Sequence, residues 1–224
     1  MRKISVCIVV VLYAVSVRTA VGQPVVGQVD DFEDGTTMDW SLGQPLAPGQ
    51  PVNVADGGPM GAGDNFLMVS PRSRLAVVNL AGQWTGDYLG AGVNAVGVDL
   101  RTTHTSPLAI RAVLFVNDFD RWTSTNSFTL PNDGNWHRRV FSLDSTAVTH
   151  VLGGSNYNGM ITNVARIMFR HQSGPPAAQG TFTSATMGVD NVRALPEPST
   201  LLACLVMATA LCRRTGRRHT GSAN

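Results

Sequence analysis

The feature that most constrains the fold of this chain is a series of short, strand-like segments separated by turn signals. Segments rich in β-branched or aromatic residues cover 66–69, 75–80, 96–100, 108–116, 136–143, 165–170 and 187–192. In 96–100 and 108–114 the apolar side chains occupy alternate positions, which gives each segment one apolar face. Glycine- and proline-rich stretches at 56–59, 131–134 and 173–176 supply the backbone angles of reversals. The pattern predicts an all-β domain.

Two packed antiparallel sheets are the simplest way to bury these apolar faces. The sequence has no repeat of fixed period, which argues against a solenoid or a propeller. Residues 43–65 are rich in Gly, Pro and Asn and are predicted to form a long surface loop. Residues 146–152 could form one or two helical turns, but the segment is short and contains β-branched residues. It is therefore predicted to be a loop as well.

The amino-terminal end has the pattern of a secretory signal peptide. Two of the first three residues, Arg2 and Lys3, are basic, and an almost unbroken apolar run follows at 4–17. Ala20 and Gly22 place small side chains where a signal peptidase requires them, so cleavage is predicted before Gln23. The alternative is a retained membrane anchor, but about 14 apolar residues fall short of the roughly 20 that span a bilayer.

The carboxy-terminal end combines a polar motif, an apolar run and a basic cluster. Residues 196–200 read Pro-Glu-Pro-Ser-Thr, and the apolar residues 201–212 predict a short hydrophobic helix. Such a helix rises only about 18 Å, against a hydrocarbon core of roughly 30 Å. The basic cluster is predicted to hold its end in the cytoplasm, and consists of Arg213, Arg214, Arg217 and Arg218.

This tail resembles the PEP-CTERM sorting signal of Gram-negative bacteria. The resemblance rests on Pro196, Glu197, Pro198 and Ser199 followed by the apolar run and the arginines. It implies that an integral-membrane exosortase cuts the chain near the motif and passes it from a transient inner-membrane anchor to the envelope, the outer surface or the extracellular matrix. The short apolar run and the extra residues 219–224 depart from the usual pattern. The alternative is a tail that only anchors the protein in the inner membrane.

The chain therefore divides into a signal peptide at 1–22, one β-sandwich domain at 23–195 and a sorting tail at 196–224. The domain contains ten arginines, no lysine and fourteen acidic residues, which gives it a formal net charge of −4. The positive net charge of the whole chain thus comes from its ends, and a nucleic-acid partner, which would need a basic domain, is not predicted. All three cysteines lie in the terminal segments, so no disulfide and no zinc site is predicted in the domain.

The domain resembles the jelly-roll sandwiches of carbohydrate-binding modules and galactose-binding-like domains. The resemblance rests on the order of three weak motifs, at 31–35 with Trp40, at 140–143 after Trp136, and at 189–192. It implies a two-sheet antiparallel jelly roll whose first and last strands are neighbours, with Trp40 and Trp136 as packing residues. The fold class predicted for the whole chain is this sandwich with a signal helix before it and a short hydrophobic helix after it.

A structural calcium ion is the cofactor that the resemblance implies. Acidic residues of the first and last strands bind it in many such sandwiches, and the matching positions are Asp31, Glu33 and Asp190. Calcium takes six to eight oxygen ligands, so carboxylates brought together here would suit it. The alternative is that these residues are strand-end and turn acids.

Two aromatic clusters are candidate sugar-binding sites, because the apolar face of a pyranose ring stacks on an aromatic side chain beside hydrogen-bonding groups. The first cluster is Trp84 with Tyr88. The second consists of Asp118, Asp120, Arg121 and Trp122. For both tryptophans the alternative is packing in the core.

Catalysis is not predicted. The histidines of the domain are scattered, and the sequence has no HExxH, GxSxG or phosphate-binding loop. Asp118 and Asp120 are too close in sequence to flank a glycosidic bond. The predicted function is a non-catalytic envelope or matrix protein that binds polysaccharide, with an envelope glycan or an exopolysaccharide as the predicted partner. A structural envelope component and a polysaccharide hydrolase are the alternatives.

Overall fold

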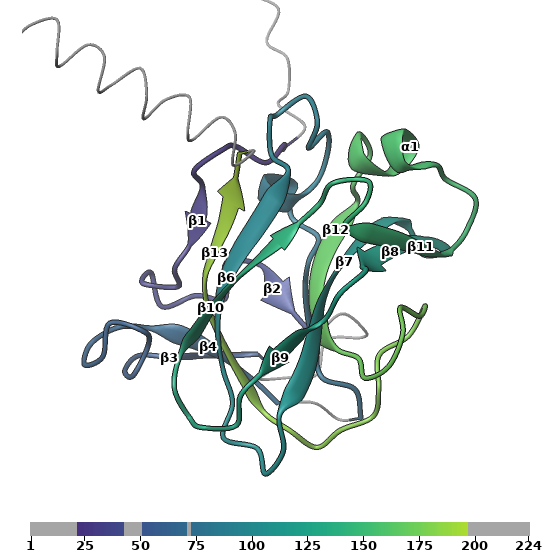
Figure 1. The fold of residues 1–224 in the computed structure, drawn as a ribbon. Coiled ribbons are helices and arrows are strands. Elements are labelled where there is room, and N and C mark those ends of the chain that lie inside the picture. Colours follow the sequence, from purple (N-terminus) through teal and green to yellow (C-terminus); the bar gives the residue numbers. More distant parts are fainter. Residues whose placement is uncertain (1–21, 43–50, 71–72, 197–224) are drawn as a thin grey trace, which may run out of the picture.

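A computed structural model describes residues 22–42, 51–70 and 73–196, and these residues form a β-sandwich. Within these ranges the strands make two antiparallel sheets, one of six strands and one of seven (Figure 1). One apolar core contains side chains from both sheets. The prediction of a two-sheet antiparallel jelly roll is confirmed.

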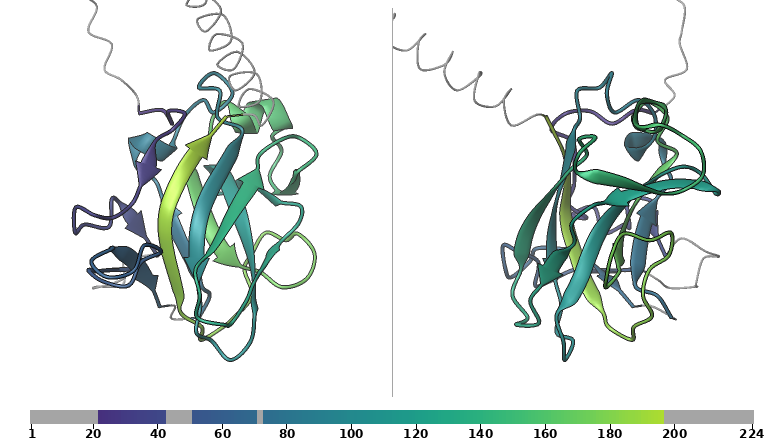
Figure 2. Two further views of the ribbon diagram at one scale, coloured as in Figure 1. Left: turned by 60° about the vertical axis from the view of Figure 1, so that its left-hand side comes forward. Right: turned by 45° about the vertical axis from the view of Figure 1, so that its right-hand side comes forward.

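The first sheet, sheet A, has its longest strands at the centre. Its order is β10-β6-β13-β4-β3, with β1 also paired to β13. Figure 2 shows β6 and β13 running side by side, and their pairing continues from Gly188↔Arg101 to Leu195↔Ala95. The strands are β1 Val29–Asp30, β3 Val52–Val54, β4 Phe66–Val69, β6 Ala95–Arg101, β10 His137–Ser142 and β13 Met187–Leu195.

The second sheet, sheet B, has the order β11-β8-β7-β12-β5-β2, and β9 also pairs with β7. Its strands are β2 Trp40–Ser41, β5 Ala76–Asn79, β7 Leu108–Asn117, β8 Asp120–Ser124, β9 Phe128–Leu130, β11 Val148–Leu152 and β12 Arg166–His171. A short 3-10 helix, Gly82–Trp84, and the α-helix α1, Tyr157–Ile161, lie in the connections.

The core lies between the sheets because alternate side chains of each strand point inward. In β6 the inward residues are Val96, Val98 and Leu100, all buried. Large rings fill the space between the layers, and Trp40 of sheet B stacks on Phe169 with ring centroids 5.7 Å apart. Burying one such side chain stabilises the fold by about 1.5–3 kcal/mol.

The first and last strands are neighbours, as the resemblance implies. Val29 pairs with Arg193 and Asp30 with Val192, so β1 lies against β13 (Figure 1). A bulge in β13 between Asp190 and Arg193, with Asn191 at φ 49°, shifts the register beside this pairing. The bulge allows Val192 to reach the core although Asp190 lies on the opposite face of the sheet.

All seven predicted strand segments are strands, and the errors concern connections. Residues 146–152 contain β11, because the β-branched residues there pair with β8. The long predicted loop at 43–65 contains β3, which pairs with β4. The strands β8 and β9 were not predicted. The terminal helices and the sorting residues Glu197, Pro198, Ser199, Arg213, Arg214, Arg217 and Arg218 lie outside the described residues. Within the described part of the chain, no helix is long and apolar enough to cross a membrane.

Candidate functional site

Five arginines gather on the outer face of sheet B because of strand alternation. Along β12, Ile167 and Phe169 point into the core, so Arg166 and Arg170 point outward. The same alternation places three further arginines on this face. They are Arg111 of β7, Arg121 of β8 and Arg74 of the segment before β5. These five residues are called the arginine face below.

Phe115 lies at the centre of one cross-strand row of this face. It is opposite Arg121 on β8 and opposite Arg166 on β12. The two guanidinium groups lie 4.9 and 4.6 Å from its ring centroid, within the range of cation–π attraction. The ring therefore holds two cations of neighbouring strands beside each other.

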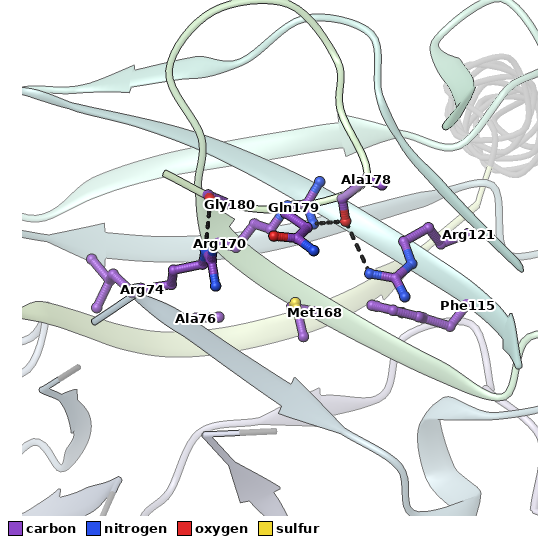
Figure 3. Close-up of a pocket in the computed structure, with 10 residues that line it drawn as sticks. Arg74, Ala76, Phe115, Arg121, Met168, Arg170, Ala178, Gln179 and Gly180 are labelled. Carbon is purple, nitrogen blue, oxygen red and sulfur yellow. Dashed lines mark hydrogen bonds between the residues drawn. The ribbon is translucent and has the colours of Figure 1, made fainter. Parts of the chain in front are cut away.

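A loop at 173–182 arches over the arginine face, and its backbone carbonyls accept hydrogen bonds from the arginines (Figure 3). Arg121 and Arg170 both donate through Nη1 to the carbonyl oxygen of Ala178, each at 2.9 Å. Arg74 donates through Nε to Gly180, and Arg111 through Nη2 to Gly174. The loop is thus held on the sheet mainly by hydrogen bonds to its main-chain carbonyl groups.

The loop and the sheet enclose a pocket of about 250 Å³. Ala76, Phe115 and Met168 give it an apolar floor drawn from β5, β7 and β12 (Figure 3). Its rim carries the guanidinium groups of Arg74, Arg121 and Arg170 and the exposed side chain of Gln179. An apolar floor with a rim of hydrogen-bond donors is the usual composition of a small-molecule site.

The arginine face has few counterions. Among the described residues, Asp118 is the one carboxylate that forms an ion pair with it, and its partner is Arg166. Burial, together with the charges of Arg121 and Arg111, lowers the pKa of Arg170 to about 10. The Nε–H groups of Arg111, Arg121 and Arg170 are buried without an acceptor in the described structure. Cations are therefore held close together mainly by neutral carbonyls.

Two exposed phenylalanines lie near the ends of the pocket. Phe182 is 66% exposed and stacks under Arg74 at 4.1 Å. Phe119 is 80% exposed at the β7–β8 turn, next to Asp118, whose carbonyl accepts a hydrogen bond from Arg121. Exposed rings of this kind are typical contact surfaces for ligands.

The first predicted sugar cluster is wrong as a surface site. Trp84 and Tyr88 are each 0% exposed, so neither ring can stack on a sugar. The Trp84 Nε1–H donates to Oδ2 of Asp30 at 2.6 Å, and the Tyr88 hydroxyl donates to the Trp84 carbonyl at 3.0 Å. Both residues belong to the core because their polar atoms find partners there.

The four residues of the second predicted cluster do not lie together in the structure. Arg121 and Asp118 belong to the rim of the arginine face, whereas Asp120 and Trp122 do not. Trp122 is buried against His150 and donates to the hydroxyl of Ser155. Asp120 accepts hydrogen bonds from the backbone N–H groups of residues 154 and 155. The prediction that these four side chains form one site is corrected accordingly.

The predicted metal set is only partly assembled. Glu33 and Asp190 are close enough to interact electrostatically, together with Asp64 and Asp99. Asp31 instead is exposed and accepts a hydrogen bond from the backbone of Glu33. Within the described residues, no three His, Cys, Asp or Glu side chains are arranged to hold a metal ion. Whether calcium binds stays a prediction.

Pro196, the first residue of the sorting motif, directly follows β13 and is the last described residue.

The pocket residues that sequence reasoning missed are Arg74, Phe115, Met168, Arg170 and Gln179. The alternation in 108–114 places Arg111 opposite an apolar face, but it does not indicate that the strands carrying the five arginines are neighbours. Trp40 is confirmed as a packing residue, and Trp136 packs on Phe66 with ring centroids 5.3 Å apart.

Comparison with known proteins shows the fold alone. No protein-family model matches the sequence, and no curated protein matches it as a relative. An exo-β-agarase superposes with a TM-score of 0.51 at 14% identity, over 75% of this chain and 25% of the agarase. The chain thus spans about a quarter of that enzyme. A family 11 carbohydrate-binding module from Clostridium thermocellum, in complex with a β-1,3-1,4-mixed-linked tetrasaccharide, has a TM-score of 0.48 at 16% identity, over 78% of this chain and 98% of the module.

Proposed function

We propose that this protein is a non-catalytic polysaccharide-binding protein of the bacterial cell envelope or extracellular matrix, and that the sugar lies in the pocket on the outer face of sheet B. The observation that carries the proposal is the pocket itself. The partly exposed side chains of Ala76 and Met168 in its apolar floor suit the apolar face of a pyranose ring. Its rim offers guanidinium and amide donors to hydroxyl groups. The fold shared with part of an agarase is consistent with a glycan ligand.

The residues at the pocket support binding without catalysis. Among the described residues that line it there is no Asp, Glu or His. Glycoside hydrolysis ordinarily needs two carboxyl groups that flank the scissile bond. Asp118, at the rim, is already engaged by Arg166. A hydrolase with its active site in this pocket is therefore disfavoured.

The destination of the protein is part of the proposal. The signal peptide and the PEP-CTERM-like tail support export, processing by a signal peptidase and an exosortase, and delivery to the outer surface. A surface protein meets exopolysaccharide there, which agrees with a glycan-binding pocket. The tail would hold the protein in the inner membrane until it is cut.

The proposal is tested with a variant in which a larger side chain fills the pocket. Ala76→Phe places a ring in the floor of the pocket, whereas Ala109→Phe adds the same ring to the same face of sheet B away from the pocket. The full-length protein and both variants are screened on a glycan array, and hits are measured by calorimetry. Ala76→Phe should weaken binding at least about tenfold, equivalent to 1.4 kcal/mol, while Ala109→Phe should not.

Melting temperatures of both variants report whether the sandwich stays folded. Glycan binding that is equally strong in the folded Ala76→Phe variant would place the site elsewhere. No binding to any glycan would reject the proposal and favour a structural envelope component. Sugar released from the array would instead favour a hydrolase.

A further inference from the structure

The arginine face concentrates positive charge in a domain that is acidic overall. Residues 23–195 carry ten arginines and a net charge of −4, yet five of the nine arginines that the structure describes lie on this one face. In the described structure one carboxylate, that of Asp118, pairs with them. The concentration is a property of the fold, because the five arginines come from four different segments.

Apart from the ion pair between Arg166 and Asp118, the hydrogen bonds that the arginines make leave their charge uncompensated. Arg121 and Arg170 converge on the single carbonyl oxygen of Ala178, and Arg170 also donates to the carbonyl of Ala177 and to Gln172. Carbonyl and amide oxygens satisfy hydrogen bonds but carry no net charge to oppose the repulsion of neighbouring cations. A buried cation is stable when it is paired, and an unpaired one is costly.

We propose that the pocket binds an acidic saccharide, a pyranose whose carboxylate or sulfate group lies among Arg74, Arg121 and Arg170 while its ring lies on the partly exposed side chains of Ala76 and Met168. This inference rests on the proposed function and names its ligand class. Guanidinium groups present a planar fork of donors that matches the oxygens of a carboxylate or a sulfate. The anion supplies the counter-charge that the described residues do not.

The size and shape of the pocket agree with one charged ring. Its volume of about 250 Å³ is slightly below the roughly 300 Å³ at which pockets for drug-sized ligands begin. Arg74 is exposed at one side, stacked on Phe182, so its free guanidinium nitrogens can approach an anion without moving the loop. Arg121 bounds the other side and remains tied to the loop.

The inference is tested with glycans that differ in charge. The probes are a polygalacturonate, a sulfated galactan and a neutral agarose oligosaccharide, each titrated into the full-length protein. The protein carries Arg213, Arg214, Arg217 and Arg218 replaced by Gln, so that the basic tail cannot attract the anions. An acidic probe should bind at least about tenfold more tightly than the neutral one. Its affinity should fall at least about tenfold from 50 to 500 mM salt, because screening shortens the range of charge interactions.

Single substitutions locate the effect. Arg121→Gln and Arg74→Gln each remove one charge from the pocket and should each weaken acidic-glycan binding about tenfold or more. Arg121→Lys keeps the charge and should restore part of the affinity. Arg138→Gln removes the same charge from the outer face of sheet A and should change nothing, since Arg138 pairs with Asp99 there. Melting temperatures show that each variant is folded.

The outcomes separate the two proposals. Preference for the polygalacturonate or for the sulfated galactan decides between a carboxylate and a sulfate, and either supports the inference. Equal affinity for the neutral and acidic probes, unchanged in Arg121→Gln and Arg74→Gln, overturns it and leaves the proposed function in place. Failure of every glycan to bind overturns both.

Discussion

Asp190 is fully buried although it lies on the outer face of sheet A, opposite Asp99 of β6. Burial, together with the smaller effect of the charges of Asp64, Asp99 and Glu33, raises the pKa of its carboxyl group to about 7, against the lowering effect of the backbone hydrogen bond from Asn191. A carboxyl group in this position binds a proton more tightly in the folded chain than in the unfolded chain. Protonation therefore stabilises the fold.

The pH dependence of stability follows from this shift. The ordinary pKa of the group is 3.8 and the folded value is about 7. Its stabilising effect is therefore complete below about pH 4 and is lost as the pH rises to about 7, a loss of about 2–4 kcal/mol. Denaturant unfolding between pH 4 and 8 should show this decline. Asp190→Asn should remove it, and Asp144→Asn, at an exposed position, should not.

The same measurements test the predicted calcium ion. A cation bound beside Asp190 favours the ionised carboxylate, so millimolar calcium should raise the melting temperature at pH 7 and flatten the pH dependence. Chelator should reverse both effects. Identical melting temperatures with calcium and with chelator would count against the predicted site.

Asp30 explains why Trp84, which the sequence placed in a candidate sugar-binding cluster, is buried in the core. Its Oδ2 atom accepts hydrogen bonds from the indole N–H groups of both Trp40 and Trp84, at 2.7 and 2.6 Å. Burial raises the pKa of this carboxyl group, while the two indole hydrogen bonds lower it. The carboxylate thereby satisfies two buried donors that would otherwise be unpaired, and unpaired donors cost about 1–3 kcal/mol each.

At the scale of elements, the turn after β11 depends on a glycine. Gly153 has φ +101°, and a Cβ atom at this position would collide with Asp120, the side chain whose carboxylate holds the turn. The neighbouring Gly154 has open space around the same position. The two glycines therefore provide a matched pair.

Gly153→Ala should destabilise the domain by about 2 kcal/mol or more, because it adds a steric clash to a left-handed backbone conformation. Gly154→Ala should change the free energy of unfolding by about 0.5 kcal/mol or less. Chemical denaturation of both variants gives the comparison. Equal effects would mean that Asp120 moves freely and does not hold the turn.

The loop over the pocket is an element whose shape is fixed by its backbone. Gly174, Ala178 and Gly180 accept hydrogen bonds from arginines of four different segments. Its small side chains leave room for the guanidinium groups beneath. The sheet thus positions the loop, and the loop in turn forms the roof of the pocket.

At the scale of the whole molecule, positive and negative charges are concentrated in different parts of the chain. The domain is acidic, its terminal segments are basic, and the arginine face is a basic area within the acidic domain. Local fields of this kind steer charged ligands toward one face. A protein delivered to a polysaccharide-rich surface would approach an acidic glycan with this face.

Processing at both ends is predicted for the protein recovered from the source cells. Intact mass spectrometry of envelope and secreted fractions should find chains that begin at Gln23 and lack residues after the 196–199 motif. Substituting Glu197→Ala should leave the tail in place, because the motif is the predicted recognition element. A wild-type chain that still ends at Asn224 would contradict the sorting prediction.

The sequence by itself determined the all-β class and most of the strands. Alternation in 96–100 and 108–114 is a local property, and each strand obeys it regardless of its neighbours. The adjacency of first and last strands was implied by the resemblance. The strand β11 was missed because its residues have little apolar periodicity and become a strand only through pairing with β8.

The tertiary structure alone decided the site. Arg74, Arg121 and Arg170 are far apart in sequence and meet because β5, β12, β7 and β8 are consecutive in sheet B. Likewise, Trp84 is buried because Asp30, 54 residues earlier, accepts its indole N–H. Strand order and long-range hydrogen bonds depend on the packing of the entire sheet, whereas local periodicity reports only the two faces of each strand.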